Sequence, residues 1–241
     1  MTPKLNAIWV YLSASPLLGL TATLLAYQLA YALYARSRFN PLVNPVAISV
    51  GVLVLILSVT GTPYQTYFDG AQFVHFLLGP ATVALAIPLY QQLEKLRRNW
   101  LAFLLGSLAG SAAAVVTAMG VGKLLGASPA TILSLAPKSV TTPIAMGISE
   151  KIGGLPSLTA VLVIATGILG AVVARGILNL MRIGDASTRG FALGVTAHGI
   201  GTARAFQVSQ EMGAFAGLAM GMSGVLTAVL LPLALKLAEF F

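Results

Sequence analysis

Two stretches of this sequence place cationic and hydroxyl side chains beside residues that interrupt helices. The first reads LAPKSVTTPIA at 135–145, and its polar side chains are Lys138, Ser139, Thr141 and Thr142. The second reads TAHGIGTARAF at 196–206, and its residues of interest are His198, Gly199, Gly201, Thr202 and Arg204. Ammonium, guanidinium and hydroxyl groups all donate hydrogen bonds to carboxylates. The two stretches therefore predict facing walls of a binding site for a small organic anion.

Prolines and glycines predict that both stretches leave the helix. Pro137 and Pro143 each lack a backbone donor and disfavour helical geometry at the residue before them. Gly199 and Gly201 free the backbone and let a ligand approach it. Non-helical backbone at membrane depth is tolerated only where protein buries it or where it lines a water-filled cavity. We therefore expect each stretch to be an unwound segment between short helical limbs.

The composition places these stretches in a membrane protein. The chain has 241 residues, of which 57% are hydrophobic and 8% charged, whereas a soluble domain carries about 25% charged residues. Its mean hydropathy is +0.90. The net charge of +8 would suggest nucleic acid in a soluble protein, but here the basic residues fall in short loops and bias topology. We expect an all-α integral membrane protein that does not bind nucleic acid.

Catalysis and metal binding are not expected. There is no cysteine, and His75 and His198 lie far apart in sequence. No nucleophile beside a base, no paired catalytic carboxylates and no phosphate-binding loop can be found in the sequence. The protein is therefore not expected to be an enzyme, and no cofactor is expected.

Apolar runs predict about six spanning helices within one membrane domain, 1–241. Their predicted ranges are 5–35, 45–60, 71–90, 100–122, 156–181 and 214–235. The aromatic stretch 61–70 is expected to be an outer loop and the charged stretch 91–99 an inner loop. The third range contains Pro80 and Pro88, which predict an interrupted helix with Thr82 near the break. Thr82 and Asn44 are additional candidate ligands.

The positive-inside bias predicts that the first unwound stretch is re-entrant. Arginines at the end of 156–181 belong inside, as does 91–99, so the chain between 122 and 156 must leave and return on one side. The segments 100–152 and 157–210 each combine a span with an interrupted segment. If the two interrupted segments enter from opposite sides, these units form an inverted repeat, an architecture common in secondary transporters.

The charged groups have alternative interpretations. Lys138 and Arg204 could bind an anionic solute, or Lys138 could snorkel while Arg204 pairs with Glu211 at a helix end. His198 could carry a coupled proton, or it could be a buried histidine bonded to a backbone carbonyl.

Four segments resemble the LrgB/CidB family of membrane proteins. They are FLLGPATVALAIPLY at 76–90, LAPKSVTTPIAMGIS at 135–149, TGILGAVVARGILNLMRI at 166–183 and TAHGIGTARAF at 196–206. That family was named antiholin-like, for effects on murein hydrolase activity and cell lysis, beside a small LrgA/CidA-type membrane partner. Its plastid relatives carry glycolate and glycerate, and bacterial relatives are linked to pyruvate movement. The resemblance implies a carrier for small monocarboxylates, in which the carboxylate is surrounded by Lys138, Ser139, Thr141, Thr142, His198, Thr202 and Arg204.

Two functional hypotheses follow. The first is a secondary transporter of small monocarboxylates, such as pyruvate, glycolate or glycerate, coupled to H⁺ or Na⁺ if it is coupled at all. The alternative is an antiholin-like or holin-like regulator of murein hydrolase activity and lysis. In either case we expect a multi-pass protein of the cell (inner) membrane, in contact with lipid and forming a homo-oligomer, with an LrgA/CidA-like partner in the regulator hypothesis.

Overall fold

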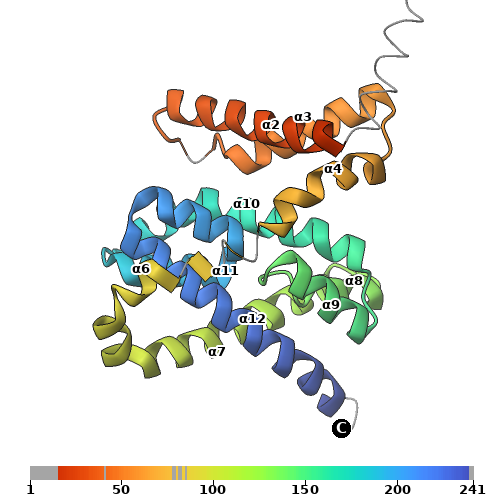
Figure 1. Ribbon diagram of the computed structural model, residues 1–241. Helices are drawn as coiled ribbons and strands as arrows, with labels where there is room; N and C mark the ends of the chain where they lie inside the picture. The colour runs from red at the N-terminus through yellow and green to blue at the C-terminus, as the bar shows by residue number, and fades with distance from the viewer. Residues whose placement is uncertain (1–15, 41, 78–79, 81–82, 85, 239–241) are drawn as a thin grey trace, which may run out of the picture. The chain divides into compact units, whose positions relative to one another are not determined.

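The computed structural model describes residues 16–40, 42–77, 80, 83–84 and 86–238, and its helices are shown in Figure 1. Within these ranges the chain is helical, and no β-strand occurs among them. The all-α prediction is therefore confirmed. The chain forms two compact units, Met1–Ala84 and Leu85–Phe241. The sequence-based expectation of a single membrane domain over 1–241 stays a prediction.

The first unit contains three helices, α2 (Pro16–Arg36), α3 (Pro45–Thr60) and α4 (Tyr64–Phe76). Asn44 starts α3 as its N-cap, because its side chain accepts hydrogen bonds from the backbone of Val46 and Ala47 at 2.9 and 3.1 Å. Gly61 ends α3 with a φ of 64°, a left-handed geometry that glycine adopts without strain. The predicted bounds 45–60 are therefore those of the helix, whereas its crossing of the membrane stays a prediction.

The loop predicted at 61–70 is wrong, because helix α4 begins at Tyr64, directly after Pro63, while its position on the outer side stays a prediction. Proline fixes its own φ near the helical value and is tolerated at the start of a helix. Once the helix starts, Tyr64 and Phe68 fall one turn apart and their rings stack with centroids 5.7 Å apart. The aromatic residues therefore extend a helical face and do not form a loop.

Four helices among the described residues are long and apolar enough to span a membrane, namely Leu17–Arg36, Leu93–Leu124, Pro156–Leu180 and Gln210–Leu237. Helix α3 is apolar but has only 16 residues. The predicted third span, 71–90, is divided between the end of α4 and the short helix α6 (Ala86–Tyr90), and its predicted break falls partly outside the described residues. The N-terminal part of the predicted span 5–35 also lies outside them.

Helix α7 (Leu93–Leu124) is the first long helix of the second unit. It begins earlier than the predicted span 100–122, so most of the charged stretch 91–99 is helical and is not the expected loop, while its position on the inner side stays a prediction. Non-helical dihedral angles at Asn99 (φ −116°, ψ 17°) mark a kink there. The Asn99 side-chain amide donates to the carbonyl of Lys95 at 3.0 Å, so the charged turn is stabilised as an extension of the apolar helix.

The first interrupted segment consists of α8 (Pro129–Leu135), a turn region and α9 (Thr142–Ile152). The end of α7 contacts α8, since a Cβ on Gly122 would lie 3.0 Å from the Leu135 side chain. The start of α10 (Pro156–Leu180) contacts α8 as well, because the backbone N–H of Leu155 donates to the Ser134 hydroxyl at 2.7 Å. The segment thus leaves and returns at one end of the unit, which gives it re-entrant geometry.

The second interrupted segment lies within α11 (Ala186–Val208), where Ala197 and His198 have non-helical dihedral angles. The limb after the break returns against the limb before it, because a Cβ on Gly201 would lie 2.7 Å from the carbonyl oxygen of Leu193. In a continuous helix those two residues would be about 12 Å apart. Helix α11 is therefore a helical hairpin.

Helix α12 (Gln210–Ala238) packs closely along α11, as Figure 1 shows. Added Cβ atoms on Gly190 and Gly194 would collide with the backbone carbonyl groups of Met212 and Ala216, respectively. The two helices can approach this closely only because both positions lack a side chain, as at other small-residue interfaces between membrane helices.

Candidate functional site

Lys138 lies in the turn region between α8 and α9. The backbone N–H groups of Lys138 and Val140 donate to the carbonyls of Leu135 and Pro137, both at 3.2 Å, so this region consists of tight turns. The Lys138 side chain is half-buried, and its Nζ donates to the hydroxyl of the buried Ser139 at 3.2 Å. An ammonium group and a hydroxyl thus lie next to each other at the first break, as the sequence predicts.

The two threonines that follow lie at the start of α9. Thr141 is its N-cap residue, with extended dihedral angles, and Thr142 is its first residue. The Thr141 side chain makes no capping hydrogen bond, and both side chains are half-buried. Their hydroxyl groups are the next polar side-chain groups along the chain after Lys138 and Ser139.

His198 forms the sharp turn of the second break. Its φ of 39° and ψ of −130° lie outside the regions that non-glycine residues normally occupy. The ring is buried, and its Nε2 is 2.9 Å from the carbonyl oxygen of Val163 on α10. The Thr202 hydroxyl donates to the His198 carbonyl at 2.8 Å, so the turn is bonded on both sides. This geometry corresponds to the histidine bonded to a backbone carbonyl, one of the two alternatives for this residue.

Gly199 and Gly201 do not have the role that the sequence predicts for them. The backbone leaves the helix at Ala197 and His198, and neither Gly199 nor Gly201 has a positive φ. Gly201 instead provides the space in which the two limbs of α11 meet, and Gly199 lies beside Met220, whose sulfur would be 3.9 Å from an added Cβ. Close packing, not backbone freedom, explains Gly201, whereas an added Cβ at Gly199 would make only an ordinary van der Waals contact.

Gly167 on α10 helps to position His198, and the sequence alone did not identify this role. A Cβ at this position would lie 2.8 Å from Cε1 and 2.9 Å from Nε2 of His198. The absence of a side chain therefore creates the space for the imidazole ring. The signal was available in the stretch TGILGAVVARG at 166–176, whose small residues indicate a face of close packing.

The two breaks meet on Val163. This residue packs in a buried cluster with Val140 and Ala145 of the first interrupted segment, and its carbonyl bonds to His198 of the second. Lys138 is near enough to His198 for the two side chains to interact electrostatically. Residues from 138 to 145 and from 197 to 202 are therefore brought together within the second unit.

Arg204 lies in a different place from Lys138. It lines a cavity of about 340 Å³ together with Arg175 of α10 and Arg189 of the first limb of α11. Lys138 is not among the residues that line this cavity. The sequence also suggested that Arg204 could pair with Glu211. In the structure the Glu211 carboxylate forms an ion pair with Lys95, whose Nζ lies 2.8 Å away.

Lys95 connects three helices at the end of the unit that contains this cavity. Its ammonium group bonds to Asp185, the N-cap residue of α11, at 2.9 Å and to Glu211 in the first turn of α12. Hydrogen bonds from the Ser187 hydroxyl, from Lys95 and from the backbone N–H of Thr188 hold the pKa of Asp185 well below its usual range. Sequence reasoning placed these charges at span ends but did not pair them.

The two additional candidates are not part of this arrangement. The Asn44 side chain caps α3 in the first unit. Thr82 lies outside the described residues, so its candidate role stays a prediction. Within the part of the chain that the structure describes, no three His, Asp or Glu side chains form a group that could hold a metal ion.

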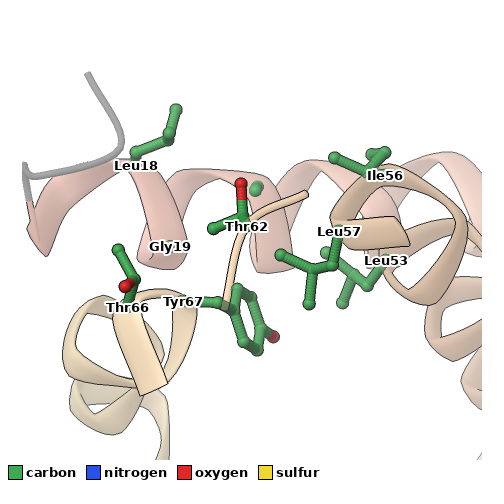
Figure 2. A pocket seen from close by; sticks show the side chains of 9 residues that line it. Leu18, Gly19, Leu53, Ile56, Leu57, Thr62, Thr66 and Tyr67 are labelled. Atoms are coloured by element: carbon green, nitrogen blue, oxygen red, sulfur yellow. The ribbon is translucent and has the colours of Figure 1, made fainter. Parts of the chain in front are cut away.

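Two other cavities offer little to a polar solute. Figure 2 shows a small pocket in the first unit, of about 50 Å³, between the side chains of α2, α3 and α4, with Tyr67 and Thr66 at its edge. This volume is well below the several hundred Å³ typical of a ligand pocket. A larger cavity of about 470 Å³ lies between α7 and α12, and almost all of its lining side chains are apolar.

Comparison with known proteins gives a consistent result across nearly the whole chain. The model of the LrgB-like family matches residues 23–237. A Bacillus subtilis (strain 168) protein named "Uncharacterized protein YwbG" is 36% identical over 223 residues, which cover 91% of this chain and 97% of that protein. Proteins named "Antiholin-like protein LrgB" from Bacillus mycoides (strain KBAB4) and Bacillus cereus (strain B4264) are each 32% identical over 219 residues, covering 91% of this chain and 95% of theirs.

No solved structure matches this chain. The family match extends from the middle of α2 to the end of α12, so it includes both interrupted segments and the spanning helices that hold them. The relatives match over almost their entire length, so the similarity is not limited to one shared motif. This helical membrane protein belongs to the LrgB-like family.

Proposed function

We propose that this chain is a multi-pass protein of the cell membrane with an antiholin-like role, restraining murein hydrolase activity and cell lysis. The observation that carries the proposal is the match to relatives named antiholin-like, over 91% of this chain. The proposal includes self-association and a small membrane partner of the LrgA/CidA type. No catalytic step is part of it.

An autolysis assay tests this role. The chain is expressed in a bacterium from which the related genes have been removed, and lysis in dilute detergent is followed by turbidity. We expect slower lysis than in the same strain expressing an unrelated polytopic membrane protein at an equal level. Equal lysis rates in the two strains would refute the antiholin-like role.

A second function is favoured by the meeting of the two breaks in the second unit: transport of a small monocarboxylate, such as pyruvate, glycolate or glycerate. The half-buried Lys138 beside Ser139 and within electrostatic range of His198 supports this. A cation inside a bilayer costs at least about 2.5 kcal/mol on the insertion scale, so it needs a partner or water. A carboxylate bound between the breaks would neutralise that ammonium group.

The arrangement of the interrupted segments along α10 supports transport as well. The first segment enters near the start of α10, where Leu155 bonds to Ser134, whereas both ends of α11 lie near its other end, where Arg175 is found. Discontinuous helices that enter from opposite ends and meet in between resemble the architecture of secondary transporters. The inverted repeat of 100–152 and 157–210, and coupling to H⁺ or Na⁺, belong to this proposal.

Uptake into proteoliposomes tests the transport function. Labelled pyruvate and glycolate are offered to wild type, to Lys138→Ala and to Lys151→Ala, whose lysine is exposed in the last turn of α9. Loss of a hydrogen bond to a charged group costs about 1.5–3 kcal/mol, which corresponds to a roughly 10- to 150-fold weaker apparent affinity. We expect that loss for the first variant and wild-type uptake for the second.

The same variants separate the two functions. If Lys138→Ala removes uptake but slows lysis as wild type does, the antiholin-like effect does not depend on transport. If both properties disappear together while Lys151→Ala keeps both, transport underlies the effect on lysis. Equal uptake by wild type, by Lys138→Ala and by empty liposomes would rule out the transport function.

A further inference from the structure

Three arginine side chains from three helical segments line one cavity at the end of α10. Arg175 comes from α10, Arg189 from the first limb of α11 and Arg204 from the second limb. Arg189 and Arg204 are half-buried, whereas Arg175 is exposed. Residues 189 and 204 are brought together only because α11 folds back at His198, so the cavity is a product of the hairpin.

Among the residues that the structure describes, the walls of this cavity include three arginines and no aspartate or glutamate. The nearby carboxylates of Asp185 and Glu211 both bond to Lys95. Arg189 donates a hydrogen bond to the Asn179 side-chain oxygen at 2.6 Å, and Arg204 donates one to the Gln207 side-chain oxygen at 3.3 Å.

The remaining walls of the cavity are mostly apolar. They include Ala171, Leu178, Leu193, Val208 and Met212, with the small residue Ser209 among them. A site that joins three guanidinium groups to apolar walls suits an anion attached to a nonpolar body. Basic pockets between membrane helices commonly bind lipid headgroups in this way.

We propose that this cavity binds a phosphate group, carried either by an anionic phospholipid or by a small soluble phosphate. The guanidinium group binds phosphate oxygens through paired hydrogen bonds, and three such groups offer more donors and more charge than one carboxylate can use. The volume of about 340 Å³ is within the range of ligand pockets. This site is distinct from the one between the breaks, and it does not depend on either proposed function.

The first test measures thermal stabilisation of the purified full chain in neutral detergent. Phosphatidylglycerol in mixed micelles and inorganic phosphate are added separately, each against potassium chloride at equal ionic strength, because salt alone screens repulsion between arginines. Stabilisation by phosphatidylglycerol alone identifies a lipid site, and stabilisation by inorganic phosphate identifies a site open to soluble ligands. Stabilisation by neither probe overturns the proposal.

Matched variants locate the site. Arg175→Gln, Arg189→Gln and Arg204→Gln should each weaken binding of the effective probe at least ~10-fold, the loss expected for one charge-assisted bond. Arg98→Gln is the control, since it makes the same change at an exposed position of α7 that does not line the cavity. Equal weakening by the control, or none by the three variants, overturns the proposal.

A measurement on the wild-type chain covers the case in which a variant does not fold. Phenylglyoxal modifies accessible arginines, and the modified positions are identified by mass spectrometry of peptides. The effective probe should protect the three cavity arginines at least ~10-fold more than it protects Arg98. Equal modification of all four with and without the probe would also overturn the proposal.

Discussion

Replacing Gly167 by alanine tests how the second break is held in place. The added methyl group would lie 2.8 Å from Cε1 and 2.9 Å from Nε2 of His198, and 2.8 Å from Cδ1 of Ile200. Side-chain carbon atoms do not approach that closely, so the imidazole ring or helix α10 must move. Inserting one methyl group into a packed interior costs about 1–3 kcal/mol.

A shift of the ring also weakens its hydrogen bond to Val163. The Nε2 of His198 is 2.9 Å from that carbonyl oxygen, and a typical protein hydrogen bond contributes about 0.5–1.5 kcal/mol. The two effects together predict a loss of roughly 1.5–4.5 kcal/mol in the free energy of unfolding of Gly167→Ala, if they add.

Gly176→Ala is the matched control, because it changes the same residue type on the same helix where an added Cβ meets nothing within 4 Å. Alanine is the better helix former by up to about 1 kcal/mol, so this variant should be as stable as wild type or slightly more stable. Thermal unfolding of both variants in detergent, followed by circular dichroism, measures the difference. If Gly167→Ala unfolds at the same temperature as the control, the close contact with His198 does not exist.

Two further predictions concern the other end of the unit. Gly190→Ala should destabilise the protein at least as strongly as Gly167→Ala, because its methyl group would meet the backbone of Met212, which cannot rotate away as a side chain can. Thermal unfolding of this variant beside Gly176→Ala measures the effect. The pKa of Asp185 is lower in the folded protein than in the unfolded chain, so ionisation of this carboxyl group stabilises the fold. The stabilisation is fully present above the unfolded pKa of about 3.9 and is lost as the pH falls through the folded pKa. The unfolding temperatures of wild type and Asp185→Asn should therefore begin to converge between pH 6 and pH 3, and parallel curves would contradict the stabilisation of this carboxylate by Ser187, Lys95 and Thr188.

Local chemistry explains why some features could be predicted. The bounds of α3 follow from Asn44, Pro45 and Gly61, which act on their nearest neighbours in the chain. Pro137 lies in a turn region where the sequence predicts an unwound segment, because a missing N–H and a fixed φ have the same effect in any surroundings. The apolar runs likewise identify the long helices.

Other features depend on residues distant in sequence. Nothing within the stretch 196–206 indicates that His198 would adopt a positive φ in preference to the glycines beside it. That conformation is stabilised by Val163 and accommodated at Gly167, both on another helix. The same turn carries Arg204 away from Lys138 and toward Arg175, which separates two cations that the sequence alone assigns to one site.

The sequence by itself determined a helical membrane protein of the LrgB-like family with helix breaks near residues 137 and 198. Hydrophobicity and backbone restrictions belong to each residue, so they can be read from the chain in order. Only the tertiary structure decided where the polar groups meet: Lys138 with Ser139 near His198, and Arg204 in a cavity with two other arginines. The direction in which a chain leaves a turn depends on what packs against it, and that information is spread over helices far apart in sequence.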